Sequence, residues 1–295
     1  MSEIARVAVV GGGLMGSGIA QVCAHAGLET RVIEVDAARA AAARAAIERS
    51  LQKGVDRGKV TSSDASAALG RLQVSASMAD VAGCDLVIEA IIEQLEAKCA
   101  MWRAVDALAA PHAIFATNTS ALPVADQAAA TRRADRFVGM HFFSPVPAMP
   151  LVEVVRAVAT SDATVEAALA VARRIGKVPI LAKDTPGFIV NLLLVPYLHD
   201  AVRAYEHGVA SVADIDTGMT LGTGVPMGPL ALCDAVGLDT MAHVGRVMFD
   251  AFHEARYATP PLIHRMVVSG WLGRKSGLGF YDYSVSPPRP REIRG

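Results

Sequence analysis

The stretch Gly11-Gly12-Gly13-Leu14-Met15-Gly16 decides the fold of this chain. It directly follows a short β-branched run, residues 4–10, and precedes residues 17–26, whose pattern predicts a helix. A second predicted strand, residues 30–35, then ends at Asp36. Strand, glycine turn, helix, strand and acid follow one another in the order of a dinucleotide-binding βαβ unit.

Each glycine of the GxGxxG pattern has its own expected role. Gly11 permits the tight turn, Gly13 lets the backbone approach a pyrophosphate, and Gly16 lets helix and strand pack closely. The helix N-terminus then offers unpaired N–H groups and a partial positive charge to the diphosphate. A glycine turn can also arise for steric reasons alone, but its place between strand and helix favours a cofactor. The predicted cofactor-binding turn is completed by Gly12, Leu14 and Met15.

Asp36 predicts which dinucleotide is bound. Its carboxylate would accept a hydrogen bond from a ribose 2′-hydroxyl and would repel a 2′-phosphate, which favours NAD over NADP. Arg39 lies near enough in the sequence to weaken the exclusion of NADP.

Strand-like and helical runs alternate up to about residue 183, which predicts an α/β fold with a Rossmann-type, doubly wound parallel sheet. The turn sequence Asp184-Thr185-Pro186-Gly187 marks the expected domain boundary. Long helical segments with few strand signals follow it. We therefore expect an NAD-binding domain over residues 1–184, an all-helical domain over 185–284, and a disordered, proline- and arginine-rich tail over 285–295.

Composition narrows the possible classes of protein. With 52% apolar and 19% charged residues, the 295-residue chain can bury a large core. A net charge of −1 gives no broad attraction to nucleic acid or anionic lipid. The four cysteines are scattered without metal-ligand spacing, so we expect no metal and a reduced, cytoplasmic protein. The glycine-broken first apolar run predicts neither a signal peptide nor a membrane span.

Residues 141–155 are almost wholly apolar and bent by three prolines, yet they carry one imidazole and one carboxylate. Glu153 falls in a run that should be a buried strand, where an unpaired charge is very costly. His141 is its obvious partner. A carboxylate that orients an imidazole makes a general base that works near neutral pH. The alternative is a purely structural pair at a strand end.

Three further side chains belong to predicted strand ends. Ser120 follows the apolar run 113–116, so its hydroxyl should face the crevice where ligands bind, although it could instead cap a helix that begins near Leu122. Glu93 and Lys98 flank the start of the predicted helix that follows the strand at residues 85–90, where an exposed ion pair is the simpler interpretation.

Arg49, Lys53 and Arg57 lie at i, i+4 and i+8 of a predicted helix and place three positive charges on one face. Solvated surface charge is one explanation of this stripe. A phosphate-rich carrier molecule is the other.

Several motifs resemble those of the short-chain (S)-3-hydroxyacyl-CoA dehydrogenases, including bacterial 3-hydroxybutyryl-CoA dehydrogenases. The resemblance extends over nearly the whole chain, to about Tyr283. Besides the glycine turn, the motifs are Asn118-Thr119-Ser120, His141-Phe142-Phe143, residues 147–153, residues 184–191, Pro226-Met227-Gly228-Pro229, residues 234–239 and residues 273–281.

The resemblance implies roles for particular residues. His141 would be the catalytic base and Glu153 its orienting carboxylate, while Ser120 and Asn191 would hydrogen-bond the 3-oxygen of the substrate. Family members place this site between their domains and are homodimers joined through the helical domain. The residues that match NAD contacts are 11–16, Asp36, Glu93, Lys98, Ser120 and Ser144, the last standing where many members have Asn. Ser50 and Arg57 match coenzyme A contacts, and Lys53 and Ser120 complete the expected substrate-contacting set.

The expected function is reversible, NAD-dependent oxidation of a (S)-3-hydroxyacyl-CoA to the 3-ketoacyl-CoA. A short acyl chain such as 3-hydroxybutyryl is expected, and chain length and pathway stay open. One alternative is a dehydrogenase of a free hydroxy acid, of the gulonate type, or of an acyl group on a carrier protein. Another is an NAD-binding structural protein without turnover.

Overall fold

The computed structural model describes residues 4–293 and divides the chain into two compact units, Met1–Phe188 and Ile189–Gly295. Each unit has its own secondary structure. No helix within the described residues has the length and apolar character needed to cross a membrane.

The first unit is built on one eight-stranded sheet with the order β3-β2-β1-β4-β5-β6-β7-β8. Strand order reverses between β1 and β4, which is the switch point where such sheets bind ligands. The strands are β1 (Arg6–Val10), β2 (Glu29–Ile33), β3 (Leu72–Ser75), β4 (Leu86–Glu89), β5 (Ile114–Thr117), β6 (Phe137–Phe142), β7 (Leu151–Arg156) and β8 (Val178–Lys183). The predicted Rossmann-type fold is confirmed.

One neighbouring pair departs from the predicted parallel arrangement. Strands β6 and β7 are antiparallel, whereas β7 and β8 are parallel again. Residues 143–150 join β6 to β7 without a helix, and such a short connection can join only antiparallel strands. The consequence is that His141 lies directly opposite Glu153 in the register.

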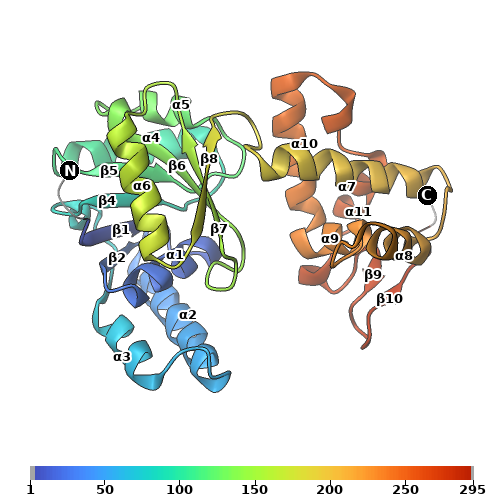
Figure 1. The fold of residues 1–295 in the computed structure, drawn as a ribbon, viewed down its shortest axis with the longest axis horizontal. Helices are drawn as coiled ribbons and strands as arrows, with labels where there is room; N and C mark the ends of the chain where they lie inside the picture. The colour runs from blue at the N-terminus through green and yellow to red at the C-terminus, as the bar shows by residue number, and fades with distance from the viewer. Residues whose placement is uncertain (1–3, 294–295) are drawn as a thin grey trace. The chain divides into compact units, whose positions relative to one another are not determined.

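Helices cover both faces of the sheet (Figure 1). One core contains Ile19 and Ile47, and the other contains Trp102, which stacks on Phe115 with ring centroids 5.0 Å apart. Burial on both faces explains why the strands are continuous apolar runs. The helices of this unit are α1 (Leu14–His25), α2 (Ala37–Asp56), α3 (Ser62–Gly70), η1 (Met78–Val81), α4 (Leu95–Leu108), α5 (Val124–Ala129), η2 (Ala134–Arg136) and α6 (Asp162–Arg174).

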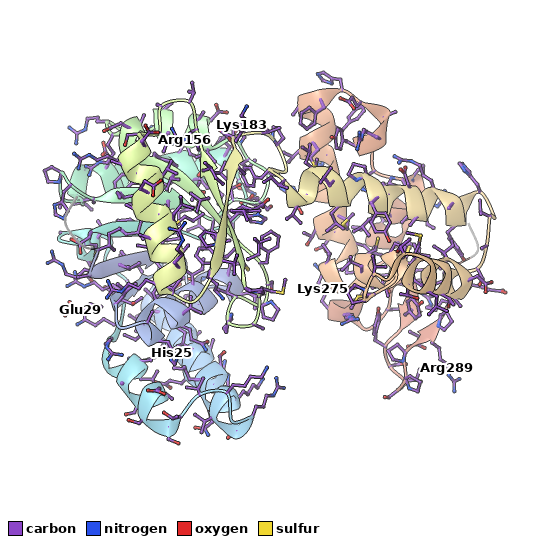
Figure 2. The ribbon with its side chains drawn as sticks, viewed as in Figure 1. His25, Glu29, Arg156, Lys183, Lys275 and Arg289 are labelled. Carbon is purple, nitrogen blue, oxygen red and sulfur yellow. The ribbon has the colours of Figure 1, made fainter. Side chains whose placement is uncertain are left out.

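Short connections and strand pairing fix where the strands begin and end. Helix α1 ends at His25 and β2 begins at Glu29, both labelled in Figure 2, with Gly27 at φ +85° between them. At the other side of the sheet, Arg156 and Lys183 end β7 and β8 as register partners (Figure 2). Both places lie toward the edge of the sheet opposite the glycine turn, because Glu29 pairs with the first residue of β1 and β7 runs antiparallel to β6.

The second unit is helical except for one short hairpin. Buried Asp234 accepts hydrogen bonds from the N–H groups of Phe280 and Tyr281 and so fastens the hairpin to the helices. The elements are α7 (Val190–Glu206), α8 (Val212–Thr223), α9 (Pro229–Val236), α10 (Leu238–Phe252), η3 (Ala255–Tyr257), α11 (Pro261–Val268), η4 (Arg274–Ser276), β9 (Tyr281–Asp282) and β10 (Arg289–Pro290).

The expected disordered tail is structured over its described part. Arg289 pairs with Asp282 in the hairpin (Figure 2). Arg291 donates to the carbonyl of Gly279 at 2.8 Å, and its guanidinium lies 4.1 Å from the ring centroid of Trp271. A proline- and arginine-rich composition is typical of disorder, but here Arg289 and Arg291 make the contacts that order the segment. Residues 294–295 lie outside the described residues.

Candidate active site

The glycine turn has the shape that a dinucleotide requires. A Cβ built on Gly11 would lie 2.6 Å from the Ala90 carbonyl oxygen, and one on Gly16 would lie 1.7 Å from the Gly11 oxygen. Both glycines are therefore needed for packing. A Cβ on Gly13 would meet nothing within 4 Å, and Gly13 is the N-cap of α1 without a side-chain cap. The open backbone and uncapped helix end fit a diphosphate.

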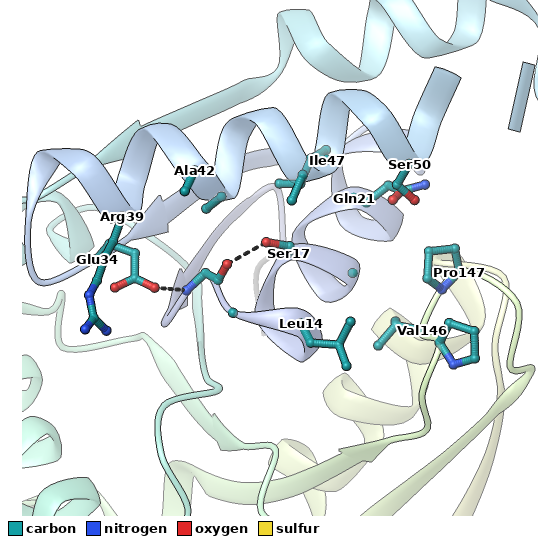
Figure 3. A pocket seen from close by; sticks show the side chains of 16 residues that line it. Leu14, Ser17, Gln21, Glu34, Arg39, Ala42, Ile47, Ser50, Val146 and Pro147 are labelled. Carbon is teal, nitrogen blue, oxygen red and sulfur yellow. Dashed lines mark hydrogen bonds between the residues drawn. The ribbon is translucent and has the colours of Figure 1, made fainter. Parts of the chain in front are cut away.

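A pocket of about 480 Å³ runs from this turn along α2 (Figure 3). Leu14 and Pro147 lie across it from Ile47 and Ser50 of α2 (Figure 3). The lining is mostly apolar with a few polar groups, and the volume is within the ~300–1,000 Å³ typical of small-molecule sites. A purine base with its ribose suits such a pocket.

Asp36, the predicted ribose contact, does not line this pocket. Asp36 is the N-cap of α2, and its Oδ1 accepts from the N–H of Arg39 at 2.7 Å. The pocket is lined instead by Glu34, whose Oε1 accepts from the Gly12 N–H at 2.7 Å (Figure 3). Strand β2 ends at Ile33, before the predicted end, so the first acid past the strand is Glu34.

Glu89, Lys98 and Glu93 form a connected ion cluster at the carboxyl end of β4. Lys98 Nζ lies 2.5 Å from Glu89 Oε1 and 3.0 Å from Glu93 Oε2. Lys98 is 1% exposed and Glu89 is fully buried, so this is not the exposed helical pair that was considered. Burial raises the pKa of Glu93, but the ammonium of Lys98 and hydrogen bonds from Thr119 and Ser120 outweigh it and leave the pKa below its ordinary value.

Ser120 is held by this cluster. Its N–H donates to Glu93 Oε1 at 2.9 Å, and its hydroxyl lies 3.3 Å from the same oxygen. Ser120 is not the N-cap of α5, because other side chains accept the hydrogen bonds of the backbone N–H groups at the start of that helix. Thr119 Oγ1 accepts from Leu122 N, and the Asp184 carboxylate accepts from the first N–H groups of α5.

The structure brings His141 and Glu153 together. Nδ1 of the ring lies 2.7 Å from Glu153 Oε2, and the two residues are 6% and 0% exposed. The rings of Phe143 and Phe188 flank the imidazole, with centroids 4.5 and 5.7 Å away. Because Nδ1 is directed at the carboxylate, Nε2 is the ring atom that can act on a substrate.

The loop that follows His141 is anchored by a lysine that the sequence did not reveal as part of the site. Lys177, just before β8, donates from Nζ to the carbonyl oxygens of Val146 at 2.5 Å and Met149 at 2.8 Å. The same loop carries the exposed Ser144 and contributes Pro147 to the pocket.

The predicted substrate contacts fall at three places. Ser50 lines the pocket. Arg49, Lys53 and Arg57 are exposed along α2 and its end, and none of them forms an ion pair with another described residue. Asn191 lies in the first turn of α7, in the second unit.

Comparison with known proteins agrees with this geometry. Residues 6–185 match the family model "3-hydroxyacyl-CoA dehydrogenase, NAD binding domain", and residues 187–283 match its C-terminal domain. A 3-hydroxybutyryl-CoA dehydrogenase of Mycobacterium tuberculosis is 45% identical over 282 residues, which cover 95% of this chain and 99% of the relative. The human mitochondrial hydroxyacyl-coenzyme A dehydrogenase is 43% identical, with 95% and 91% covered.

Solved structures lead to the same family. The crystal structure of FadB2 from M. tuberculosis matches with a TM-score of 0.94 at 45% identity, covering 96% of this chain and all of that one. The (S)-3-hydroxybutyryl-CoA dehydrogenase PaaH1 of Ralstonia eutropha gives 0.92 at 42% identity, with the same coverage. The expected resemblance is confirmed: the chain belongs to the 3-hydroxyacyl-CoA dehydrogenase family of oxidoreductases.

Proposed function

We propose that this protein reversibly oxidises short-chain (S)-3-hydroxyacyl-CoA thioesters, such as 3-hydroxybutyryl-CoA, with NAD as oxidant. The observation that carries the proposal is the buried His141–Glu153 pair, near the carboxyl end of β6 in a sheet whose first turn fits a dinucleotide. Relatives with 3-hydroxybutyryl-CoA in their names support the choice of acyl chain.

Residues 11–16 would hold the diphosphate of NAD, and Glu34 would accept from the hydroxyls of the adenosine ribose. The same carboxylate would repel a 2′-phosphate, which supports NAD over NADP. Glu93, Lys98, Ser120 and Ser144 remain the proposed contacts on the nicotinamide side. When bound, NAD supplies the acceptor for the hydride that leaves C3 of the substrate.

His141 would act as the general base through Nε2. It takes the proton of the 3-hydroxyl group during oxidation and returns it during reduction. Glu153 holds the ring in one orientation at 2.7 Å and stabilises the imidazolium that forms. The phenyl rings around the imidazole exclude water, which strengthens this charge interaction.

Ser120 and Asn191 would fix the 3-oxygen. Glu93 positions Ser120 through the backbone N–H and the hydroxyl. Asn191 follows Phe188 by three residues, and Phe188 packs on His141.

The coenzyme A moiety would lie along α2 at the Ser50 end of the pocket, away from Glu34 and the adenosine ribose (Figure 3), where Lys53 and Arg57 offer unpaired positive charge to its phosphates. Family membership further supports a homodimer joined through the helical unit, and we place the enzyme in the cytoplasm.

Three substrates test the proposal by the loss of NADH absorbance. We expect rapid turnover with acetoacetyl-CoA, and much slower turnover with free acetoacetate and with an acetoacetyl group on a carrier protein. Faster reduction of the free acid or of the carrier-bound group would favour the corresponding alternative. Absence of turnover with all three would favour a non-catalytic NAD-binding protein.

A further inference from the structure

The Glu89–Lys98–Glu93 cluster lies next to the glycine turn. Glu89 is the last residue of β4, which pairs with β1 at the switch point of the sheet. Ala90 and Ile91 follow Glu89 directly. A Cβ built on Gly11 would lie 2.6 Å from the Ala90 carbonyl oxygen and 3.0 Å from the Ile91 nitrogen. The cluster therefore adjoins the segment that receives the dinucleotide.

The cluster carries a net negative charge. Glu89 accepts from Lys98, from the Ile91 N–H at 2.7 Å and from the Thr117 hydroxyl at 2.6 Å. Glu93 accepts from Lys98, from the Thr119 hydroxyl at 2.5 Å and from Ser120. The groups that contact the two carboxylates are an ammonium, backbone N–H groups and hydroxyls, all of which can donate to them. Two carboxylates and one ammonium leave one negative charge.

Burial makes that charge effective at a distance. Glu89 and Lys98 are withdrawn from water, and the side chain of Glu93 is 26% exposed. Buried charges are screened much less than surface charges, because the local dielectric constant is lower and mobile ions are excluded.

We propose that the net charge of the Glu89–Lys98–Glu93 cluster determines how strongly the site favours oxidised over reduced cofactor. The inference rests on the proposed function, in which NAD binds with its nicotinamide toward the ends of β4 and β5. The nicotinamide ring carries a positive charge when oxidised and none when reduced. A buried negative charge at those strand ends stabilises the oxidised ring and leaves the reduced ring unaffected. Glu89, which is fully buried and bonded to Lys98, is then a positioning and charge-setting residue rather than a contact.

A purely structural role is the competing explanation, because the cluster also fastens α4 to β4 and β5. The effect of the charge can be separated from the effect of packing with three variants. Glu89→Gln keeps the shape and brings the cluster to neutrality. Glu89→Gln combined with Lys98→Met removes both members of the inner pair and restores the single negative charge of Glu93. Thr117→Val removes a hydrogen bond to Glu89 without changing any charge.

The experiment measures dissociation constants without substrate, NAD⁺ by calorimetry and NADH by its fluorescence. A variant that weakens a contact shared by both nucleotides changes both constants equally, so the ratio Kd(NAD⁺)/Kd(NADH) does not change. In Glu89→Gln we expect this ratio to rise about tenfold because one buried negative charge is lost. In the double variant it should return to within about threefold of the wild-type ratio, and in Thr117→Val it should not change.

An unchanged ratio in Glu89→Gln, or a double variant that stays at the Glu89→Gln value, would overturn the inference. Thermal melting checks that each variant is folded. If Glu89→Gln does not fold, Glu93→Gln makes the same charge change at a partly exposed position and must raise the ratio in the same direction. Failure of the wild type to bind either nucleotide would instead refute the proposed function.

Discussion

Two acidic residues, Glu34 and Asp36, both lie about as far past the glycine turn as a ribose-binding acid does. Spacing alone could not separate them, because the end of a strand is predicted only to within about two residues. The structure separates them by hydrogen bonds: Glu34 bonds the glycine turn, and Asp36 bonds the first turn of α2.

Alanine variants of these two acids should therefore behave differently. In Glu34→Ala we expect the Kd of NAD to rise about tenfold and the affinity for NADP to improve, because a charged acceptor is lost. Asp36→Ala should leave both affinities unchanged and lower the free energy of unfolding by about 1 kcal/mol, the usual value of an N-cap. Calorimetric titration and urea unfolding measure the two effects. The reverse pattern would return the ribose to Asp36.

Buried acids within apolar strands carried the most information in the sequence. Glu153 was found because an unpaired charge in a buried strand needs a partner, and His141 lies 2.7 Å away. Glu89 carries the same signal at the end of β4, but its partner Lys98 lies on the following helix, which the strand pattern does not reveal. Lys177 gave no such signal, because its partners are backbone carbonyls of a loop.

At the scale of elements, α2 is the helix most directly tied to the substrate proposal. The triple variant Arg49→Ala, Lys53→Ala, Arg57→Ala should raise the KM for acetoacetyl-CoA about tenfold, since each exposed charge contact contributes ~0.2–1 kcal/mol. The KM for acetoacetyl-pantetheine, which lacks the nucleotide phosphates, should not change. Added salt should reduce the difference between variant and wild type.

Arg103→Ala on α4 is the matched control, because Arg103 is also an exposed helical arginine. An equal rise in KM for both thioesters, or an effect of Arg103→Ala, would contradict phosphate binding by α2.

Elements with strong periodicity were predictable and short ones were not. The helix over α2 and the strands with continuous apolar runs follow from pattern alone. Strand β3 (Leu72–Ser75) is an edge strand with only two apolar residues, and α3 is short, so neither stood out. The antiparallel β6–β7 pair could have been inferred from the missing helix between the strands.

At the scale of the whole molecule, the two units were foreseeable from the change in character near Asp184, but the ordered end of the chain was not. Its contacts depend on tertiary partners such as Trp271 and Gly279, which no local pattern encodes.

Stability in mild acid should depend on one histidine of the second unit. His199 is fully buried in α7, and burial, with a smaller effect of the Arg203 charge, lowers its pKa to about 4. The unfolded chain binds a proton near the ordinary pKa of about 6.5, so the stabilising difference is complete above that pH and is lost as the pH falls toward about 4. We expect the wild type to lose about 2 kcal/mol of unfolding free energy between about pH 7.5 and pH 5 from this group.

Urea unfolding of His199→Gln should show a correspondingly flatter pH dependence, whatever its overall stability. The exposed His207→Gln, at the end of the same helix, serves as control. Parallel pH profiles for His199→Gln and the wild type would show that His199 does not titrate in this range.

The central claim is that His141, oriented by Glu153, moves the proton of the substrate hydroxyl. The most direct measurement is the turnover of acetoacetyl-CoA with NADH by His141→Gln, with the exposed His25→Gln as control. The account predicts a fall in kcat of about 10²–10⁴-fold in His141→Gln, with NADH affinity retained and His25→Gln unaffected. A kcat for folded His141→Gln within a few-fold of the wild type would contradict it.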